Sequence, residues 1–314
     1  MRAEDWKSFI YDLPKDFNPS SFIMDFLREN EILSVKRISF KSPFRSPFKV
    51  NNTVYVELFE PHLKSVDAFL LFVHGFGLTK RKKALYSFLP ERLARLGLRS
   101  AFITLPYHLE RTPPGKSSSA WFRDFNDVET AAFFHQAVLD IRSAVRLLKC
   151  DDTPFIAGIS LGAMISVIAL AVEEGLKGGF LILGGGNLER IVWRSLFRFF
   201  ANEEGCGRRE CHRLYRRYPD YLREVESKGS WRDVDLPKIC FLFDPLTFAP
   251  FVRGKKVVMI NSLFDAIIPL ASALELWKAL GKPEIHWLPS THGLTVLWGR
   301  KIARIIFDKI KIGR

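Results

Sequence analysis

The feature that most constrains the fold is a series of six apolar runs, rich in β-branched and aromatic residues, that recurs along the chain. Their apolarity is continuous rather than alternating, which indicates strands covered on both faces, as in a parallel sheet. Helical patterns with apolar residues three or four positions apart, such as 82–97 and 127–150, lie between most of them. We therefore predict an α/β fold with a mostly parallel sheet and helices on both faces. The six runs occupy residues 68–73, 100–105, 154–159, 179–184, 256–261 and 284–289.

The early segment 31–61 has a different pattern. The sequences SVKRISF and TVYVELFE alternate apolar with polar residues, and a stretch rich in Ser, Pro and Asn separates them. Alternation of this kind is typical of strands with one solvated face. The segment therefore predicts an antiparallel hairpin at the edge of the sheet.

A long insertion, residues 188–250, interrupts the alternation of strands and helices. Its first half is apolar and aromatic with arginines between, and its second half is basic and predicted to be helical. A flexible linker would contain few aromatic residues. We therefore expect an α/β core formed by 1–187 and 251–314, with 188–250 as a helical cap. The aromatic residues of this cap that are expected to line an apolar pocket are Trp193, Phe197, Phe199, Phe200 and Trp231.

Composition excludes several classes of protein. No stretch approaches the roughly 18 uninterrupted apolar residues of a membrane span, and the first 17 residues lack the apolar core of a signal peptide. Four cysteines are sparse for a disulfide scaffold of this size, and the spacing of Cys206 and Cys211 matches no zinc or haem motif. We therefore expect a cytoplasmic protein without a metal.

The net charge of +13 raises the question of an acidic partner. The basic excess is dispersed, with local runs such as 80–83, and the chain has no basic tail and no RNA-binding signature. We therefore expect no nucleic-acid partner and interpret most of the excess as solvated surface.

The motif Gly158-Ile159-Ser160-Leu161-Gly162 lies where an expected strand gives way to an expected helix. A sharp strand-to-helix turn forces its central residue into a strained conformation and crowds the residues two positions away, which must then lack a Cβ atom. The turn would lift the Ser160 hydroxyl over the sheet edge. It would also point the Leu161 N–H at a developing oxyanion.

A serine needs a base to act as a nucleophile at neutral pH. Asp265 directly follows the strand expected at 256–261, and His292 follows the strand expected at 284–289. Sites in open α/β sheets lie at the carboxyl ends of the strands. We therefore expect Ser160, Asp265 and His292 to meet there as nucleophile, acid and base.

Each of these residues also has a simpler interpretation. Ser160 fits a structural serine in a glycine-rich turn, and Asp265 fits an N-cap for a helix that begins near Pro269. His292 fits a cap for the last helix. Asp244 is the rival acid, although its position before a strand makes the geometry harder. These alternatives stay open at the level of sequence.

The sequence FVHGFG, residues 72–77, follows the first long buried strand. Its turn can bring the backbone N–H of Phe76 to the same oxyanion as that of Leu161. His74 is expected to hold this turn by hydrogen bonds. The residues expected around the substrate pocket are His74, Gly75, His108 and Trp193.

Together, HGFG, GISLGA, SLFDAIIP and STHG resemble the α/β-hydrolase superfamily over roughly residues 50–310. LPYHLERTPPG and FDPLTFAP are similar to one branch, the alpha/beta-hydrolase domain-containing proteins related to the eukaryotic type 18 group. The resemblance implies an eight-stranded sheet, no cofactor and acyl transfer to water. It assigns Ser160 as nucleophile, His292 as base and Asp265 as acid. Dehalogenases of the superfamily carry a carboxylate at the position of Ser160, in the turn between strand and helix that is called the nucleophile elbow. The serine there argues against dehalogenase chemistry.

We therefore expect a serine hydrolase that cleaves a small-molecule carboxylic ester or thioester through an acyl-enzyme on Ser160. Arginines in the expected cap leave open a membrane-associated hydrolase or acyltransferase acting on an anionic lipid. Residues 190–200, RIVWRSLFRFF, would then form an amphipathic helix in the membrane interface. A non-catalytic, lipid-binding homologue is the remaining alternative.

Overall fold

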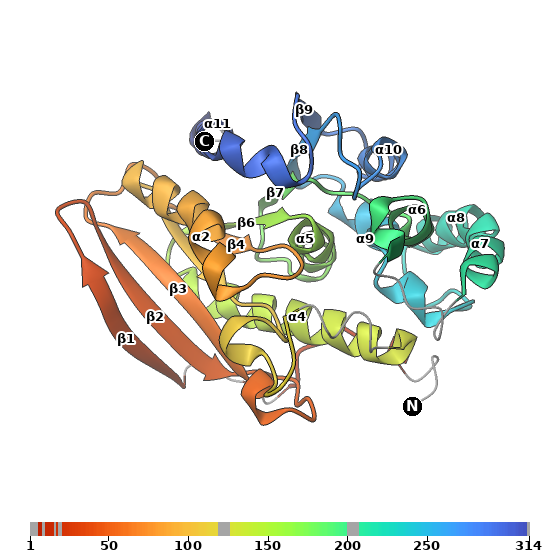
Figure 1. The fold of residues 1–314 in the computed structure, drawn as a ribbon, viewed down its shortest axis with the longest axis horizontal. Helices are drawn as coiled ribbons and strands as arrows, with labels where there is room; N and C mark the ends of the chain where they lie inside the picture. The colour runs from red at the N-terminus through yellow and green to blue at the C-terminus, as the bar shows by residue number, and fades with distance from the viewer. Residues whose placement is uncertain are drawn as a thin grey trace.

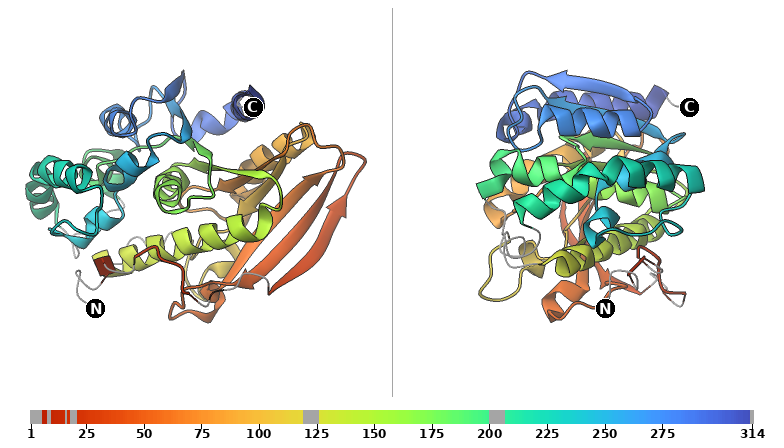
Figure 2. Two further views of the ribbon diagram at one scale, coloured as in Figure 1. Left: turned by 180° about the vertical axis from the view of Figure 1, so that it is seen from behind. Right: turned by 90° about the vertical axis from the view of Figure 1, so that its right-hand side faces the viewer.

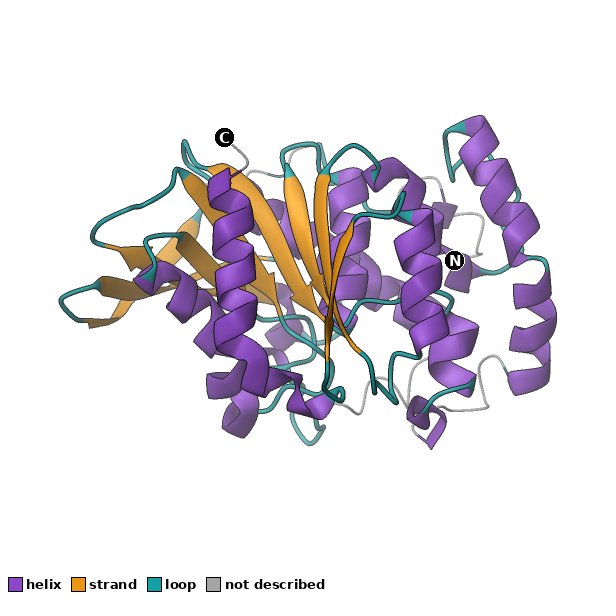
Figure 3. Ribbon diagram, turned by 90° about the horizontal axis from the view of Figure 1, so that it is seen from above, coloured by secondary structure: helices purple, strands orange, loops and turns teal. Residues whose placement is uncertain are grey.

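The computed structural model describes residues 6–7, 10–15, 17, 21–118, 126–199 and 207–312. Within these residues a single mixed sheet of nine strands crosses the molecule (Figure 1), in the order β1-β2-β3-β5-β4-β6-β7-β8-β9. The sheet lies between layers of helices (Figure 3), so its middle strands are covered on both faces.

Six strands form the parallel part of the sheet, and each lies within two residues of a predicted apolar run. Every neighbouring pair from β5 to β9 is parallel. Burial on both faces explains why their sequences are apolar throughout. The α/β fold predicted from the apolar runs is therefore confirmed. These strands are β4 (Ala68–Val73), β5 (Arg99–Ile103), β6 (Thr153–Ile159), β7 (Gly178–Ile182), β8 (Lys256–Ser262) and β9 (Glu284–Leu288).

The antiparallel part confirms the predicted hairpin and adds one strand. The strands β2 (Leu33–Lys41) and β3 (Thr53–Pro61) form the hairpin, and β3 pairs with β5. The outer strand β1 (Phe22–Glu29) pairs only with β2 among the described residues, which makes nine strands rather than the expected eight. Every residue of β1 is exposed, so its sequence carries no burial pattern that predicts a strand.

Four helices cover the two faces of the sheet near the site. The helices α4 (Asp127–Leu148) and α5 (Leu161–Val172) lie on one face, and α2 (Lys80–Arg95) and α11 (Gly299–Ile312) lie side by side on the other (Figures 1 and 2). Each pair packs into its own cluster of buried apolar residues. A further helix, α10 (Leu270–Ala279), connects β8 to β9.

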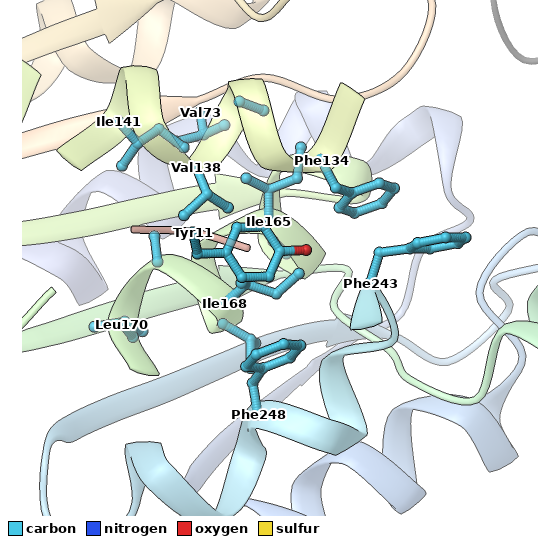
Figure 4. Packing of buried hydrophobic residues seen from close by; sticks show 14 of the residues in the cluster. Tyr11, Val73, Phe134, Val138, Ile141, Ile165, Ile168, Leu170, Phe243 and Phe248 are labelled. Carbon is cyan, nitrogen blue, oxygen red and sulfur yellow. The ribbon is translucent and has the colours of Figure 1, made fainter. Parts of the chain in front are cut away.

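The N-terminal segment packs into the layer formed by α4 and α5. Tyr11 lies among Val138, Ile168 and Phe248 (Figure 4). Its hydroxyl donates a hydrogen bond of 2.7 Å to the carbonyl of Leu242. The start of the described chain therefore belongs to the core.

The described part of the insertion is mostly helical, and its last segments pack on the helices of the core. Residues 245–252 pack against α5 and residues 239–242 against α4, and Phe241 and Phe248 are fully buried in the same cluster. The boundary of the cap at residue 250 stays a prediction. Its elements are α6 (Leu188–Trp193), η3 (Leu196–Phe199), α7 (Arg208–Arg216), α8 (Tyr218–Lys228), η4 (Ile239–Leu242), α9 (Pro245–Phe248) and η5 (Ala249–Val252).

The continuous amphipathic helix expected over 190–200 does not form in the described part of that segment. The helix α6 ends at Trp193, and a separate 3-10 turn begins at Leu196. Ile191 and Trp193 are buried, so this stretch does not present one apolar face outward. None of the helices in the described part of the chain combines the length and apolarity that crossing a bilayer requires.

Candidate active site

Ser160 occupies a strained turn between β6 and α5. Its backbone angles are φ 55° and ψ −117°, a conformation that non-glycine residues rarely adopt. A Cβ atom on Gly158 would lie 2.2 Å from the Gly162 carbonyl oxygen, and one on Gly162 would lie 2.2 Å from that of Val73. Both glycines are therefore required by close backbone approach, as the motif predicts.

Asp265 and His292 form a hydrogen-bonded pair at the carboxyl ends of β8 and β9. The His292 Nδ1 donates to the carboxylate, at 2.8 Å from Oδ2 and 3.0 Å from Oδ1. Oδ1 also accepts the backbone N–H groups of Ile267 and Ile268, each at 2.8 Å. The carboxylate therefore fixes the ring with its proton on Nδ1 and leaves Nε2 as an acceptor.

One cavity joins the serine to this pair. Ser160 and His292 both line it, and the two side chains have no mutual hydrogen bond in this structure, where both are described. The Ser160 hydroxyl has no other hydrogen-bond partner among the described residues. The structure thus brings together the three residues that the sequence places at separate strand ends.

Asp244, the rival acid, lies elsewhere. Its buried carboxylate accepts the N–H groups of Asn187, Leu188 and Leu246 and the hydroxyl of Tyr215, at 2.8–3.1 Å. Burial raises the pKa of this carboxyl. The contacts tie the start of the insertion to its end, and none of them reaches His292. Asp265 is therefore the carboxylate that orients the imidazole.

Two buried histidines hold the loop that carries Phe76. The Leu105 N–H donates to Nε2 of His74 at 3.0 Å, and the Gly77 N–H donates to Nε2 of His108 at 3.2 Å. Each Nδ1 donates to a backbone carbonyl, that of Gly75 for His74 and that of Pro106 for His108. Both rings must be neutral to accept these N–H groups.

Burial lowers the pKa of His108 to about 4 and that of His74 well below its usual value. In the unfolded chain a histidine side chain takes up its proton near pH 6.5, whereas in the folded protein these two rings stay neutral to a lower pH. Their contribution to the free energy of unfolding is therefore complete above pH 6.5 and is lost as the pH falls toward 4. We expect the free energy of unfolding to fall by about 2 kcal/mol per buried histidine between pH 7 and pH 5. Urea unfolding of wild type and His108→Gln at both pH values measures this, because the glutamine oxygen still accepts from Gly77 but does not titrate. An equal fall in both proteins would contradict this role of His108.

The cavity has a volume of about 440 Å³ and is mostly apolar. It lies between α2 and the segment formed by η6 (Gly293–Trp298) and α11. Phe197 is the one described residue of the insertion that lines it. The lining residues are Phe72, Phe76, Lys82, Leu85, Tyr86, Phe88, Leu89, Ile159, Ser160, Ile182, Leu183, Phe197, Ile267, His292, Gly293, Thr295, Val296, Gly299 and Ile302.

The four residues expected around the pocket do not line this cavity. His74 and His108 are fully buried because they bind the backbone of the loop, and Trp193 is buried in the large apolar cluster that also contains residues of α4 and α5. Gly75 lies beside the site, since a Cβ there would be 3.5 Å from the Ser160 Cβ. Of the expected cap aromatics, only Phe197 faces the cavity.

The other two described cap aromatics, Trp231 and Phe199, lie in different surroundings. Trp231 packs on Phe248 and Phe251, and Phe199 is largely exposed. Phe200 lies outside the described residues. The aromatic character of these residues does not distinguish side chains that line a pocket from side chains that pack in the core.

Sequence reasoning missed the contribution of α2 to the site. Tyr86 lines the cavity, and its hydroxyl lies close to Ser160. A Cβ atom built on Gly75 would lie 3.4 Å from the Tyr86 hydroxyl oxygen and 3.5 Å from the Ser160 Cβ. Burial raises the pKa of Tyr86, so the hydroxyl remains a donor at neutral pH. Leu85 and Phe88 follow the same helical spacing that predicts a core face, which is why the sequence did not separate them from core residues.

A strained serine after a parallel strand, with a His–Asp pair at the next strand ends, defines the class of α/β hydrolases. A model of the alpha/beta hydrolase family matches residues 70–298. The chain therefore belongs to the alpha/beta hydrolase family. No curated protein matches the sequence. None of these findings bears on the narrower type 18 branch.

Solved structures with the same fold include esterases and a peptidase. A cold-adapted esterase from an Arctic intertidal metagenomic library is 17% identical, with a TM-score of 0.58, over 92% of this chain and 97% of that one. An acetyl xylan esterase from Paenibacillus sp. R4 is 14% identical, with a TM-score of 0.62, over 96% and 92%. The acylaminoacyl peptidase of Pyrococcus horikoshii is 17% identical, with a TM-score of 0.60, over 90% of this chain and 42% of that one. The chain therefore shares its fold with these solved structures.

Proposed function

We propose that the protein is a serine hydrolase that cleaves carboxylic esters or thioesters through an acyl-enzyme on Ser160. The observation that supports this most is the His292–Asp265 pair, at 2.8 Å, opening into the same cavity as the strained serine. A serine in a purely structural turn would not need a half-buried imidazole, oriented by a carboxylate, in the same cavity. The apolar cavity suits an acyl chain.

The proposed reaction follows from the orientation of the imidazole. Nε2 of His292 takes the Ser160 proton as the hydroxyl oxygen attacks the acyl carbonyl, and Asp265 stabilises the resulting cation. The N–H groups of Phe76 and Leu161 stabilise the oxyanion, Leu161 because the first N–H groups of a helix lack intrahelical acceptors. The imidazolium then protonates the leaving alcohol or thiol. Water, deprotonated by Nε2, releases the acid and restores the serine.

We further propose that residues 188–238 form the cap, shortened relative to the sequence-based boundary. Phe197 supports this, because it lines the cavity. Its ring centroid also lies 5.6 Å from that of Phe76, in the loop after β4 that is proposed to bind the oxyanion. This proposal assigns residues 239–250 to the core because 239–242 pack against α4 and 245–252 pack against α5. The cap would shield the acyl chain from water at this side of the cavity.

The test is a series of p-nitrophenyl esters from acetyl to octanoyl, together with labelling by a fluorophosphonate probe. We expect hydrolysis and labelling, and a rise in kcat/KM of up to about fourfold per methylene as the chain fills the cavity, since a buried methylene contributes about 0.8 kcal/mol. Val296→Trp, which fills the cavity mouth, should flatten the series, whereas Leu297→Trp, one residue outside the lining, should not. Absence of both hydrolysis and labelling would contradict the proposal.

A further inference from the structure

The surface around the cavity mouth has an unusual charge. It is formed by the described segments 76–88, 194–199, 262–270 and 290–301, and is called the mouth surface below. These segments contain eight basic residues and a single acidic one, Asp265, which is buried and bound to His292. The basic residues are Lys80, Arg81, Lys82, Lys83, Arg194, Arg198, Arg300 and Lys301.

Most of these basic side chains are not neutralised by the protein. Lys83 is paired with Glu57, and Arg194 with Glu189. The other six form no ion pair with any residue that the structure describes. The mouth surface therefore presents several uncompensated positive charges.

The same surface exposes large apolar side chains. Phe199 is 71% exposed, Phe264 66% and Leu297 76%. Isolated exposed residues of this kind are ordinary, but a contiguous apolar patch marks an interaction site. The exposed apolar residues of the mouth surface are Leu85, Phe88, Leu196, Phe199, Leu263, Phe264, Leu270, Leu294, Val296 and Leu297.

Backbone contacts show that these segments are contiguous. The Leu196 N–H donates to the Ala266 carbonyl at 2.9 Å, and the Phe264 N–H donates to the Ser290 carbonyl at 3.1 Å. Across the cavity, a Cβ on Gly299 would lie 3.1 Å from the Phe88 ring. The short helices after β7 and β9, the loop after β8 and the first half of α2 therefore surround one opening, where α2 and α11 lie side by side (Figure 1).

We propose that the mouth surface docks on an anionic phospholipid bilayer, so that the apolar side chains enter the interface and the cavity opens onto the acyl region. A lipid surface offers both an apolar layer and negative charge, which matches both properties of the patch. A second copy of the chain would present the same positive charge and be repelled. This docking proposal depends on the proposed hydrolase function only for the acyl chain that the cavity would receive. Docking itself requires no reaction at Ser160.

The experiment is co-sedimentation of the full chain with vesicles of phosphatidylcholine, with and without phosphatidylglycerol. We expect binding to the mixed vesicles that weakens with added salt, and much weaker binding to phosphatidylcholine alone. The variant Phe199→Ser/Leu297→Ser should lose about tenfold in partition coefficient. Its matched control, Ile23→Ser/Leu63→Ser, removes side chains that are 65% and 85% exposed far from the mouth and should bind like wild type.

Two further measurements separate the possible outcomes. Lack of binding to anionic vesicles, or equal loss in both double variants, would overturn the docking. A dimer in size-exclusion chromatography that disappears in Phe199→Ser/Leu297→Ser would make the surface a contact between copies and would also overturn it. Ser160→Ala should bind vesicles like wild type. Binding without hydrolysis of any soluble ester leaves the docking standing and contradicts only the proposed function.

Discussion

Replacing Ser160 with alanine is expected to lower kcat for p-nitrophenyl ester hydrolysis by about 10⁴-fold or more and to abolish labelling by a fluorophosphonate. The reason is that, in the proposed mechanism, the acyl-enzyme forms on the Ser160 oxygen, and alanine has no hydroxyl to replace it. The fold should survive, because alanine keeps the Cβ atom and the strained backbone that the turn already tolerates. The hydroxyl also makes no hydrogen bond that the variant would lose. Steady-state kinetics and thermal unfolding measure both expectations.

The control for this substitution is Ser87→Ala. Ser87 lies on α2 next to Tyr86 and does not line the cavity, so its removal should leave kcat and labelling unchanged. If Ser160→Ala kept wild-type turnover while remaining folded, Ser160 would not be the nucleophile. Loss of activity together with loss of the folded state would instead call for Ser160→Cys, which keeps a nucleophile and should still react with the probe.

The part of the fold that the sequence predicts correctly is the part fixed by local patterns. Continuous apolarity located all six parallel strands, because such strands are buried on both faces wherever they lie in the sheet. Alternation located the hairpin of β2 and β3. The strand β1 escaped because its residues are exposed on both faces, and no pattern of burial is imposed on them.

The proposed catalytic residues could also be selected from the sequence, for a topological reason. The carboxyl ends of parallel strands share one edge of the sheet, so polar residues just after β6, β8 and β9 must come together. The choice between Asp265 and Asp244 needed coordinates. Both follow apolar stretches, but Asp244 is enclosed by the N–H groups of the insertion and Asp265 faces the imidazole.

The substrate cavity was beyond sequence reasoning. It forms where α2 meets η6 and α11, which lie at opposite ends of the hydrolase core in sequence. Residues such as Leu89 and Ile302 have the spacing of ordinary core positions, and only tertiary packing leaves space between them. The sequence-based prediction placed the pocket among the aromatic residues of the insertion instead. Its tryptophans pack into or against the main apolar cluster, Trp193 within it and Trp231 at its edge.

Asp265→Asn is expected to lower kcat/KM by about 10⁴-fold without unfolding the protein. The asparagine Oδ1 keeps the N–H groups of Ile267 and Ile268, which donate to Oδ1 of Asp265 in this structure. The amide nitrogen then faces Nδ1 of His292 as a donor, so Nδ1 must become the acceptor and the proton moves to Nε2. A protonated Nε2 cannot accept the proton of Ser160. Kinetics with p-nitrophenyl esters and the rate of fluorophosphonate labelling should fall together, while the unfolding transition changes little.

Asp244→Asn is the matched control, because it makes the same chemical change in the rival carboxylate. Oδ1 of Asp244 accepts the N–H groups of Asn187 and Leu246, and Oδ2 accepts the Leu188 N–H and the Tyr215 hydroxyl. The amide oxygen of asparagine can keep two of these donors, but its amide nitrogen cannot accept the other two. Leaving a buried donor without an acceptor costs about 1–3 kcal/mol, so this variant should unfold at a lower temperature. Its kcat/KM, measured well below that temperature, should equal that of wild type. The opposite result, an inactive but stable Asp244→Asn beside an active Asp265→Asn, would transfer the acid role to Asp244 and require that the carboxylate reach His292 by a movement of the insertion.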